Sequence, residues 1–347
     1  MARDKARVLI VGTGGVGTLA AYALEIGGKA TVTAVMRSNY DVVKEKGIRI
    51  DSIEHGHDIK GYRPTEIRKT VPDVTKEGIE PYDFILVTTK NVADVPPTAS
   101  DLIAPAVTPG KTAIVLSQNG LNIEKPVVAR FPNNPIISSV STIGATEKEK
   151  GFIIHDDTDE QKIGPFHNPG VSAAVAEAAA RRYIDIYNPN GKLTTLYEPD
   201  VLKTRWRKLV YNASFNSVAT VLRMDATRMR ATEHVVDDLL KPIMREIIAA
   251  AKACGVELDA NLPDIVVFND PIEAWFYPSM AQDILKGNFI EAEVIVGEPL
   301  REGESRGVPM STLKVIYGLL KAEQVKTKEK KGLWKPEFGP GHPYKGE

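Results

Sequence analysis

A glycine-rich turn near the start of the chain constrains the fold more than any other feature. The apolar run Val8–Val11 leads into Gly12-Thr13-Gly14-Gly15-Val16-Gly17, and a helical pattern then continues to Gly27-Gly28. Glycines at this spacing let a strand turn tightly into a helix and let a pyrophosphate approach the backbone. The N–H groups at the start of that helix would face the phosphates. A second β-rich run, Ala30–Met36, completes a strand–turn–helix–strand unit, which favours a dinucleotide site over an ordinary glycine turn.

The end of the second β-rich run indicates which dinucleotide is bound. Sites for NAD carry an acidic residue about twenty residues after the glycines, where it holds the ribose hydroxyls. Here the run ends in Arg37-Ser38-Asn39, with no acid at its tip. A guanidinium pairs with a phosphate through two hydrogen bonds. The sequence therefore favours NADP over NAD, with a solvated loop arginine as the alternative.

Composition and charge exclude several classes of protein. The chain has 347 residues and a formal net charge of −1, with an isoelectric point near 6.6, so there is no basic surface for nucleic acid or an anionic membrane. No apolar run is long enough to span a bilayer, and no secretory leader precedes the first strand. Cys254 is the only cysteine. We therefore predict a cytoplasmic protein with neither internal disulfides nor a metal site.

The order of the segments predicts two domains. Buried strands are expected at Phe84–Thr88, Thr112–Leu116 and Pro135–Val140, and an acidic loop, Asp156–Glu160, is expected to join a late antiparallel pair. From about Glu198 onward the patterns are mainly helical. We predict an α/β Rossmann-type domain over 1–195, an all-α domain over 196–325 and a tail over 326–347, with the active-site cleft between the domains.

Two polar segments follow predicted strands of the first domain. Lys90 comes after the buried run Phe84–Thr88, and Gln118-Asn119-Gly120 comes after Thr112–Leu116. Open α/β sheets bind ligands at the carboxyl ends of their strands. Lys90 could contact cofactor phosphate or ribose there, and Asn119 could bind nicotinamide ribose or substrate. A solvated lysine and a simple Asn-Gly turn are the alternatives.

A polar stripe marks the helical half. Lys208, Asn212 and Asn216 recur at every fourth position of an otherwise apolar helix, so they share one face. Such a face suits a cleft wall that grips a polar ligand, with a buried polar network as the alternative. Farther along, Ser279 begins a helix, where a hydroxyl and free N–H groups would bind a carboxylate. Glu291 could accept a proton or orient a lysine.

Together these segments resemble the ketopantoate reductase family over most of the chain. The resemblance implies a Rossmann domain and a helical domain, with NADPH and a 2-oxo acid meeting in the cleft. The matching stretches, in chain order, are Gly12–Gly17, Arg37, Thr89-Lys90, Gln118-Asn119-Gly120, Lys208–Asn216, Pro278–Asp283 and Glu291–Gly297.

The resemblance also implies a role for each matching residue. The NADPH contacts would be Gly12, Thr13, Gly14, Gly15, Val16, Gly17, Arg37, Lys90 and Asn119. Lys208 would be the catalytic lysine, with Glu291 as the glutamate of the site. The substrate contacts would be Asn212 and Ser279, with Asn216 as a supporting residue. Asn119 is a further candidate substrate contact because of its place after a predicted strand.

The expected reaction is hydride transfer from NADPH to the carbonyl carbon of a 2-oxo acid, with 2-dehydropantoate (ketopantoate) giving pantoate as the first choice. Lys208 would stabilise the charge on the carbonyl oxygen and donate the proton. Phe276 and Val296 stand where family members often have asparagine, which favours a different 2-oxo acid or ketone as the alternative. A non-catalytic NADPH-binding sensor is a second alternative. The expected partners are the small-molecule substrate and, as an open possibility, a second copy in a homodimer.

Overall fold

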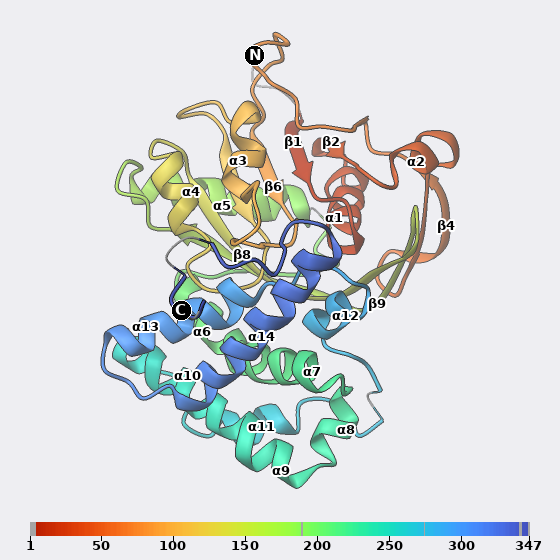
Figure 1. The fold of residues 1–347 in the computed structure, drawn as a ribbon. Coiled ribbons are helices and arrows are strands. Elements are labelled where there is room, and N and C mark those ends of the chain that lie inside the picture. The colour runs from red at the N-terminus through yellow and green to blue at the C-terminus, as the bar shows by residue number, and fades with distance from the viewer. Residues whose placement is uncertain (1–4, 189, 274, 340–341, 346–347) are drawn as a thin grey trace. The chain divides into compact units, whose positions relative to one another are not determined.

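The chain divides into two compact units, Met1–Arg205 and Trp206–Glu347. The computed structural model describes residues 5–188, 190–273, 275–339 and 342–345. Figure 1 labels many of the helices and strands of the two units. The first unit is an α/β structure around one sheet, and the second is built from helices. The predicted combination of a Rossmann-type domain and an all-α domain is therefore confirmed.

The first unit contains a ten-stranded sheet and the helices that connect its strands. Helix α6 begins in this unit and ends in the second. The elements are β1 (Ala6–Val11), α1 (Gly15–Ile26), β2 (Ala30–Val35), α2 (Tyr40–Lys46), β3 (Ile48–Ser52), β4 (Gly56–Tyr62), β5 (Glu66–Arg68), β6 (Phe84–Val87), α3 (Ala99–Ile103), the short 3₁₀ turn η1 (Ala104–Ala106), β7 (Ala113–Leu116), α4 (Lys125–Arg130), β8 (Ile136–Glu149), β9 (Phe152–Phe166), α5 (Ala173–Tyr187), β10 (Thr194–Tyr197) and α6 (Val201–Tyr211).

The strand order places a topological switch in the middle of the sheet. The order is β4-β3-β9-β8-β7-β6-β1-β2-β5, and β10 pairs with β9. From β1 the chain moves one way to β2, and from β6 it moves the other way to β7 and β8. The strands β2, β1, β6, β7 and the start of β8 run parallel. Ligands of open α/β sheets bind outside the carboxyl ends of the strands at such a switch.

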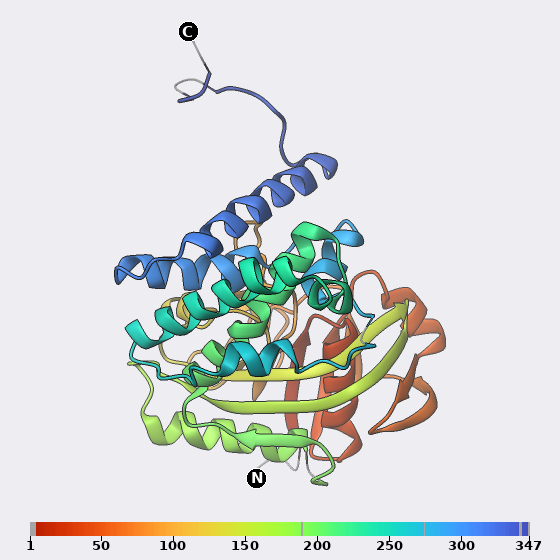
Figure 2. The ribbon, with the colours of Figure 1, turned by 90° about the horizontal axis from the view of Figure 1, so that it is seen from below.

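The core of the first unit explains why its strands are continuous apolar runs. All four residues of β6 and of β7 are buried, as expected for parallel strands covered on both faces. Helices α1 and α5 pack against the sheet and against each other, and Figure 2 shows α5 lying along the long, curved strands β8 and β9. Leu19 and Leu24 from α1 join Tyr183 and Tyr187 from α5 in this core.

The acidic run Asp156–Glu160 is part of β9, so the prediction of a loop was wrong. Its residues pair with β8, as in Gly144 with Asp157 and Thr142 with Glu160. The long antiparallel partner supplies the backbone hydrogen bonds, and this outweighs the low strand propensity of aspartate. Asp159 faces inward and accepts hydrogen bonds from Tyr187 Oη (2.6 Å) and Gln161 Nε2 (2.8 Å). Burial raises the pKa of Asp159.

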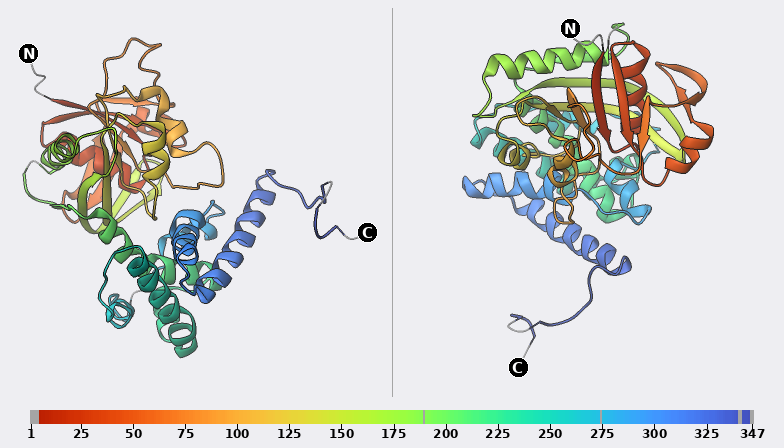
Figure 3. Two further views of the ribbon diagram at one scale, coloured as in Figure 1. Left: turned by 90° about the vertical axis from the view of Figure 1, so that its left-hand side faces the viewer. Right: turned by 90° about the horizontal axis from the view of Figure 1, so that it is seen from above.

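The second unit is helical, and several of its helices contain a wide π turn. Figure 3 shows α14 as a long, straight helix, and its 20 residues run to Lys330, into the segment expected as a tail. The elements after α6 are η2 (π, Asn212–Asn216), α7 (Ser217–Leu222), α8 (Ala226–Arg230), α9 (Glu233–Val235), η3 (π, Val236–Leu240), α10 (Lys241–Ala253), α11 (Leu262–Val267), α12 (Ser279–Leu285), η4 (π, Glu293–Gly297), α13 (Glu298–Ser305) and α14 (Ser311–Lys330).

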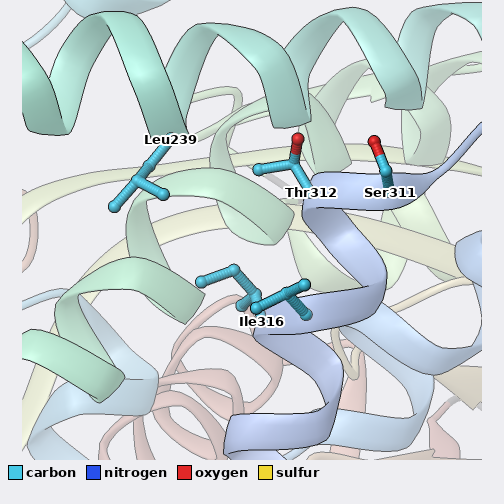
Figure 4. Close-up of a pocket in the computed structure, with 5 residues that line it drawn as sticks. Leu239, Ser311, Thr312 and Ile316 are labelled. Atoms are coloured by element: carbon cyan, nitrogen blue, oxygen red, sulfur yellow. The ribbon is translucent and has the colours of Figure 1, made fainter.

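A shallow pocket lies within the second unit, where η3 faces α14. Figure 4 shows Leu239 on one side of it, with Thr312 and Ile316 of α14 on the other. Ser311 and Val315 complete its lining. None of the candidate site residues lines this pocket. Among the helices in the described residues, none is both long enough and apolar enough to cross a membrane.

Candidate functional site

In the first unit the candidate residues follow the carboxyl ends of neighbouring strands. Arg37 comes just after β2, the glycine loop after β1, Lys90 after β6 and Asn119 after β7. These strands are adjacent in the order β7-β6-β1-β2, and all are parallel. The sheet therefore brings all four segments to one edge, next to the switch between β1 and β6. Arg37 and Lys90 are exposed there, and Asn119 is half-buried.

The three glycines at the G-x-G-x-x-G spacing of the glycine loop have different surroundings. Gly12 has a φ of +108°, and a Cβ at this position would lie 2.5 Å from the backbone nitrogen of Thr89. A Cβ at Gly17 would overlap the carbonyl oxygen of Gly12. Gly14 is different, because a Cβ there would meet nothing within 4 Å. The first and last glycines thus permit close packing, whereas Gly14 leaves open space at the start of α1.

Buried side chains hold the glycine loop against β2. Thr13 donates a hydrogen bond to the carbonyl oxygen of Val35 (3.0 Å). Asn39 Nδ2 donates to the carbonyl oxygen of Thr13 (3.0 Å) and to Glu147 Oε1 (3.0 Å). Asn39 is only 4% exposed, so it supports the loop from within, while its neighbours Arg37 and Ser38 are exposed.

The turns after β6 and β7 are joined to each other. Gln118 is buried, and its side-chain Nε2 donates to the carbonyl oxygen of Thr89 (2.7 Å). This contact ties the residue before Lys90 to the residue before Asn119. A buried ion pair, Arg205 with Glu124, lies beneath the same turn. Nothing in the sequence pattern singled out this pair, because Arg205 reads as one more basic residue of α6 and Glu124 as a surface residue before α4.

In the second unit the polar stripe lies where α6 passes into α7. Lys208 belongs to α6, and Asn212 and Asn216 are the first and last residues of the π turn η2. In a regular α-helix, which has 3.6 residues per turn, each step of four residues turns the side chain slightly past the starting direction. Asn216 would therefore lie well to one side of Lys208. The π turn is wider and has a smaller rotation per residue, so Asn216 lies closer to the helix face that carries Lys208. Lys208 is half-buried, and both asparagines are buried.

The structure brings further candidate residues to this helix. Asn216 Nδ2 donates to Ser279 Oγ at 3.3 Å. Helix α12, which begins at Ser279, packs against η2 and α7, and η4 also packs against η2. The segments that carry the Lys208 stripe, Ser279 and Glu291 are thus neighbours within the second unit.

Two glutamates lie close together in the sequence at the start of η4, and the contacts of Glu293 identify it as structural. Glu293 accepts hydrogen bonds from Lys321 Nζ (2.6 Å), Tyr317 Oη (2.8 Å) and Arg301 Nη1 (3.0 Å). Burial alone would raise the pKa of Glu293, but these donors outweigh it and hold the pKa below its usual value. Glu293 is therefore a structural ion-pair partner. Glu291, only 3% exposed, precedes the π turn and is the glutamate to consider for chemistry.

The two positions that depart from the family pattern have different surroundings. Val296 is fully buried within η4, so it packs in the helical core. Phe276 is 42% exposed and lies in the segment that leads to Ser279. That segment is held to α8, because the backbone N–H of Ala226 donates to the carbonyl oxygen of Phe276 (3.1 Å). Of the two, only Phe276 is exposed to solvent.

Comparison with known families gives matches to both units. The family model described as "Ketopantoate reductase PanE/ApbA" matches residues 8–168. The model described as "Ketopantoate reductase PanE/ApbA C terminal" matches residues 200–324. An uncharacterized protein of Saccharomyces cerevisiae is 34% identical, over 95% of this chain and 96% of the relative.

Solved structures of similar fold cover most of this chain. The crystal structure of 2-dehydropantoate 2-reductase from Methylococcus capsulatus is similar with a TM-score of 0.76 and 30% identity, covering 92% of this chain and 97% of that one. A D-mandelate dehydrogenase with NADH and anilino(oxo)acetate shares the fold, with a TM-score of 0.77 and 19% identity over 93% and 99% of the two chains. A ketopantoate reductase from Staphylococcus aureus, described as dimeric, has a TM-score of 0.71 and 19% identity over 92% and 99%.

Proposed function

The chain belongs to the ketopantoate reductase family, a family of oxidoreductases, and we propose that it reduces a 2-oxo acid to a 2-hydroxy acid with NADPH. The favoured reaction is that of 2-dehydropantoate to pantoate. The observation that carries this proposal is the polar stripe of Lys208, Asn212 and Asn216, with Ser279 Oγ 3.3 Å from Asn216 Nδ2. A protein that only bound a nucleotide would need the glycine loop but would have no use for this stripe.

The residues of the first unit fit a nicotinamide dinucleotide. The open space at Gly14 is a cradle that a Cβ would fill, and it lies where the N–H groups of α1 begin, as a pyrophosphate site requires. Arg37 is exposed at the end of β2, where it would pair with the phosphate on the adenosine ribose and so favour NADPH over NADH. Lys90 would hold phosphate or ribose, and Asn119 would hold the nicotinamide ribose.

The residues of the second unit supply the chemistry around the carbonyl group. When bound, the cofactor supplies the hydride. Lys208, as an ammonium group, stabilises the negative charge that develops on the carbonyl oxygen and donates the proton to it. Asn212 and Ser279 bind the carboxylate or hydroxyl groups of the substrate, and Asn216 holds Ser279 in place. Glu291 orients the ammonium group of Lys208 or a water molecule.

A different 2-oxo acid is the second candidate substrate. Phe276 is an exposed aromatic residue three positions before Ser279, where it favours a bulkier or more apolar substrate group than that of 2-dehydropantoate. Val296 does not add to this argument, because its side chain is fully buried.

A substrate panel tests the proposal. Purified protein is mixed with NADPH and either 2-dehydropantoate or one of several 2-oxo acids with branched or aromatic side chains, and NADPH consumption is followed by absorbance. The 2-hydroxy acid product is identified by mass spectrometry. Turnover with 2-dehydropantoate supports the favoured reaction, and turnover only with a bulkier acid supports the second candidate. NADPH binding without turnover of any 2-oxo acid in the panel would contradict both candidate reactions and would favour a non-catalytic NADPH-binding sensor.

A further inference from the structure

The buried side chain of Arg205 donates hydrogen bonds to the backbone of the turn after β7. Arg205 is 3% exposed and belongs to α6. Its Nη1 donates to the carbonyl oxygens of Gln118 and Gly120, both at 3.0 Å. Its Nε donates to Glu124 Oε1 (2.6 Å) and to Ser138 Oγ (2.8 Å). Carbonyl oxygens that point toward one another repel, and the guanidinium of Arg205 offsets this repulsion by donating to both.

The turn contains two residues with positive φ. Gly120 has a φ of +104°, and Asn122 has a φ of +58°, which is an uncommon value for a residue with a side chain. Glu124, at the end of the turn, is fully buried and balances the charge of the arginine. A buried charge without a partner is strongly destabilising, so the two residues act as one unit, here called the Arg205–Glu124 clamp.

We propose that the Arg205–Glu124 clamp is a positioning device for the cofactor site, because it sets the backbone on both sides of Asn119. The carbonyl groups before and after Asn119 are both held by Arg205, which fixes the direction in which the Asn119 side chain leaves the turn. Gln118 extends the same support to Thr89, the residue before Lys90. This inference rests on the proposed role of Asn119 in binding NADPH.

The chemistry of the clamp requires an arginine. A planar guanidinium has five N–H donors in a fixed fork, and here they meet a carboxylate, a hydroxyl and backbone carbonyls in different directions. A lysine carries the same charge on one flexible ammonium group and cannot reach all of these acceptors. Arg205→Lys therefore keeps the positive charge beside Glu124 but loses some of the hydrogen bonds to the turn. This variant separates the effect of the hydrogen bonds from the effect of the charge.

The test compares Arg205→Lys and Glu124→Gln with a matched control. Asn134 is 1% exposed, and its Nδ2 donates to the carbonyl oxygens of Thr108 (2.9 Å) and Thr112 (2.7 Å), at the opposite end of β7. Asn134→Ala therefore loosens a buried turn of the same strand away from the carboxyl edge. The readouts are NADPH dissociation constants from fluorescence titration, steady-state kinetics and melting temperatures.

We expect Arg205→Lys to weaken NADPH binding by up to about tenfold, the scale of losing the one neutral hydrogen bond that Asn119 would make. Glu124→Gln should weaken NADPH binding less, since the amide oxygen still accepts from Arg205, but its melting temperature should fall because the buried charge of Arg205 loses its partner. Asn134→Ala should lower the melting temperature and leave NADPH affinity unchanged. In an Asn119→Ala background, Arg205→Lys should cause little further loss, because the clamp acts through Asn119.

Several results would overturn the inference without touching the proposed function. One is that Asn119→Ala weakens NADPH binding, whereas both clamp variants bind NADPH like the Asn134→Ala control. Another is that the losses from Arg205→Lys and Asn119→Ala multiply independently. Failure of both clamp variants to fold would assign the pair to stability alone and overturn it too. If the unaltered protein does not bind NADPH, it is the proposed function that fails.

Discussion

In the first unit the candidate residues come after the ends of parallel strands, whereas in the second unit they lie on or next to helical segments, including the π turns η2 and η4. The strand ends expose backbone groups and glycines, and buried residues such as Thr13, Asn39 and Arg205 hold that backbone in place. The helices instead present individual polar side chains, as with Asn216 and Ser279. Changes in the first unit should therefore act on cofactor affinity and stability, and changes in the second on turnover and substrate affinity.

The largest expected effect is at Lys208. A general acid contributes about 10²- to 10⁴-fold to a rate, so Lys208→Ala should lower kcat on that scale with little change in NADPH affinity. Lys203→Ala is the control, because Lys203 is an exposed lysine of the same helix. A loss of less than about tenfold, or an equal loss in the control, would contradict the role of Lys208.

The glycine loop offers the next sharpest contrast. Gly17→Ala places a Cβ on the carbonyl oxygen of Gly12, and overpacking of this kind costs about 1–3 kcal/mol. Its melting temperature should fall. Gly14→Ala has space for the Cβ, so its melting temperature should not change, while NADPH binding should weaken because the Cβ fills the phosphate cradle. Thermal denaturation and NADPH titration of both variants check this, and equal melting temperatures for the two would argue against it.

Much of the first unit could be predicted because strand ends follow simple rules. The expected strands are present as β1, β2, β6, β7 and the start of β8. The carboxyl ends of parallel strands then bring Arg37, Lys90 and Asn119 to one edge. The acidic run in β9 was misread because its strand structure depends on β8, a distant partner that local composition does not reveal.

The rest of the site depends on long-range contacts that the sequence does not encode locally. Arg205 and Glu124 are 81 positions apart, and no spacing rule joins them. The spacing of Lys208, Asn212 and Asn216 pointed to one helix face, but the π turn that realigns Asn216 could not be foreseen from the pattern. Nor could Phe276 and Val296 be told apart, because only the fold shows that one is exposed and the other buried.

A moderate effect is expected at Arg37, which tests the choice of cofactor. Hydrogen bonds to charged groups contribute about 1.5–3 kcal/mol, so Arg37→Ala should raise the KM for NADPH by about 10- to 100-fold. The KM for NADH should stay the same, since NADH lacks the extra phosphate. Arg63→Ala serves as the control, because Arg63 is an exposed arginine whose Nη2 donates to the backbone carbonyl oxygen of Glu45. Equal losses for NADPH and NADH would assign Arg37 to general structure.

The smallest expected effect is at Ser279. Ser279→Ala removes one neutral hydrogen bond, worth about 0.5–1.5 kcal/mol, so the KM for the 2-oxo acid should rise by about two- to tenfold. NADPH affinity should not move. Ser311→Ala is the matched control, because Ser311 is also an exposed serine at the start of a helix in the second unit. A change in NADPH affinity alone would contradict the proposal that the first unit binds the cofactor and the second unit binds the substrate.

Deuterium transfer tests the central claim most directly. The unaltered protein is incubated with NADPH that carries deuterium at the transferable position of the nicotinamide ring, together with the 2-oxo acid that the panel identifies. The account predicts a 2-hydroxy acid with one deuterium on the former carbonyl carbon, in equal amount to the NADPH consumed. Product without deuterium on that carbon, or NADPH consumption without any 2-hydroxy acid, would contradict it.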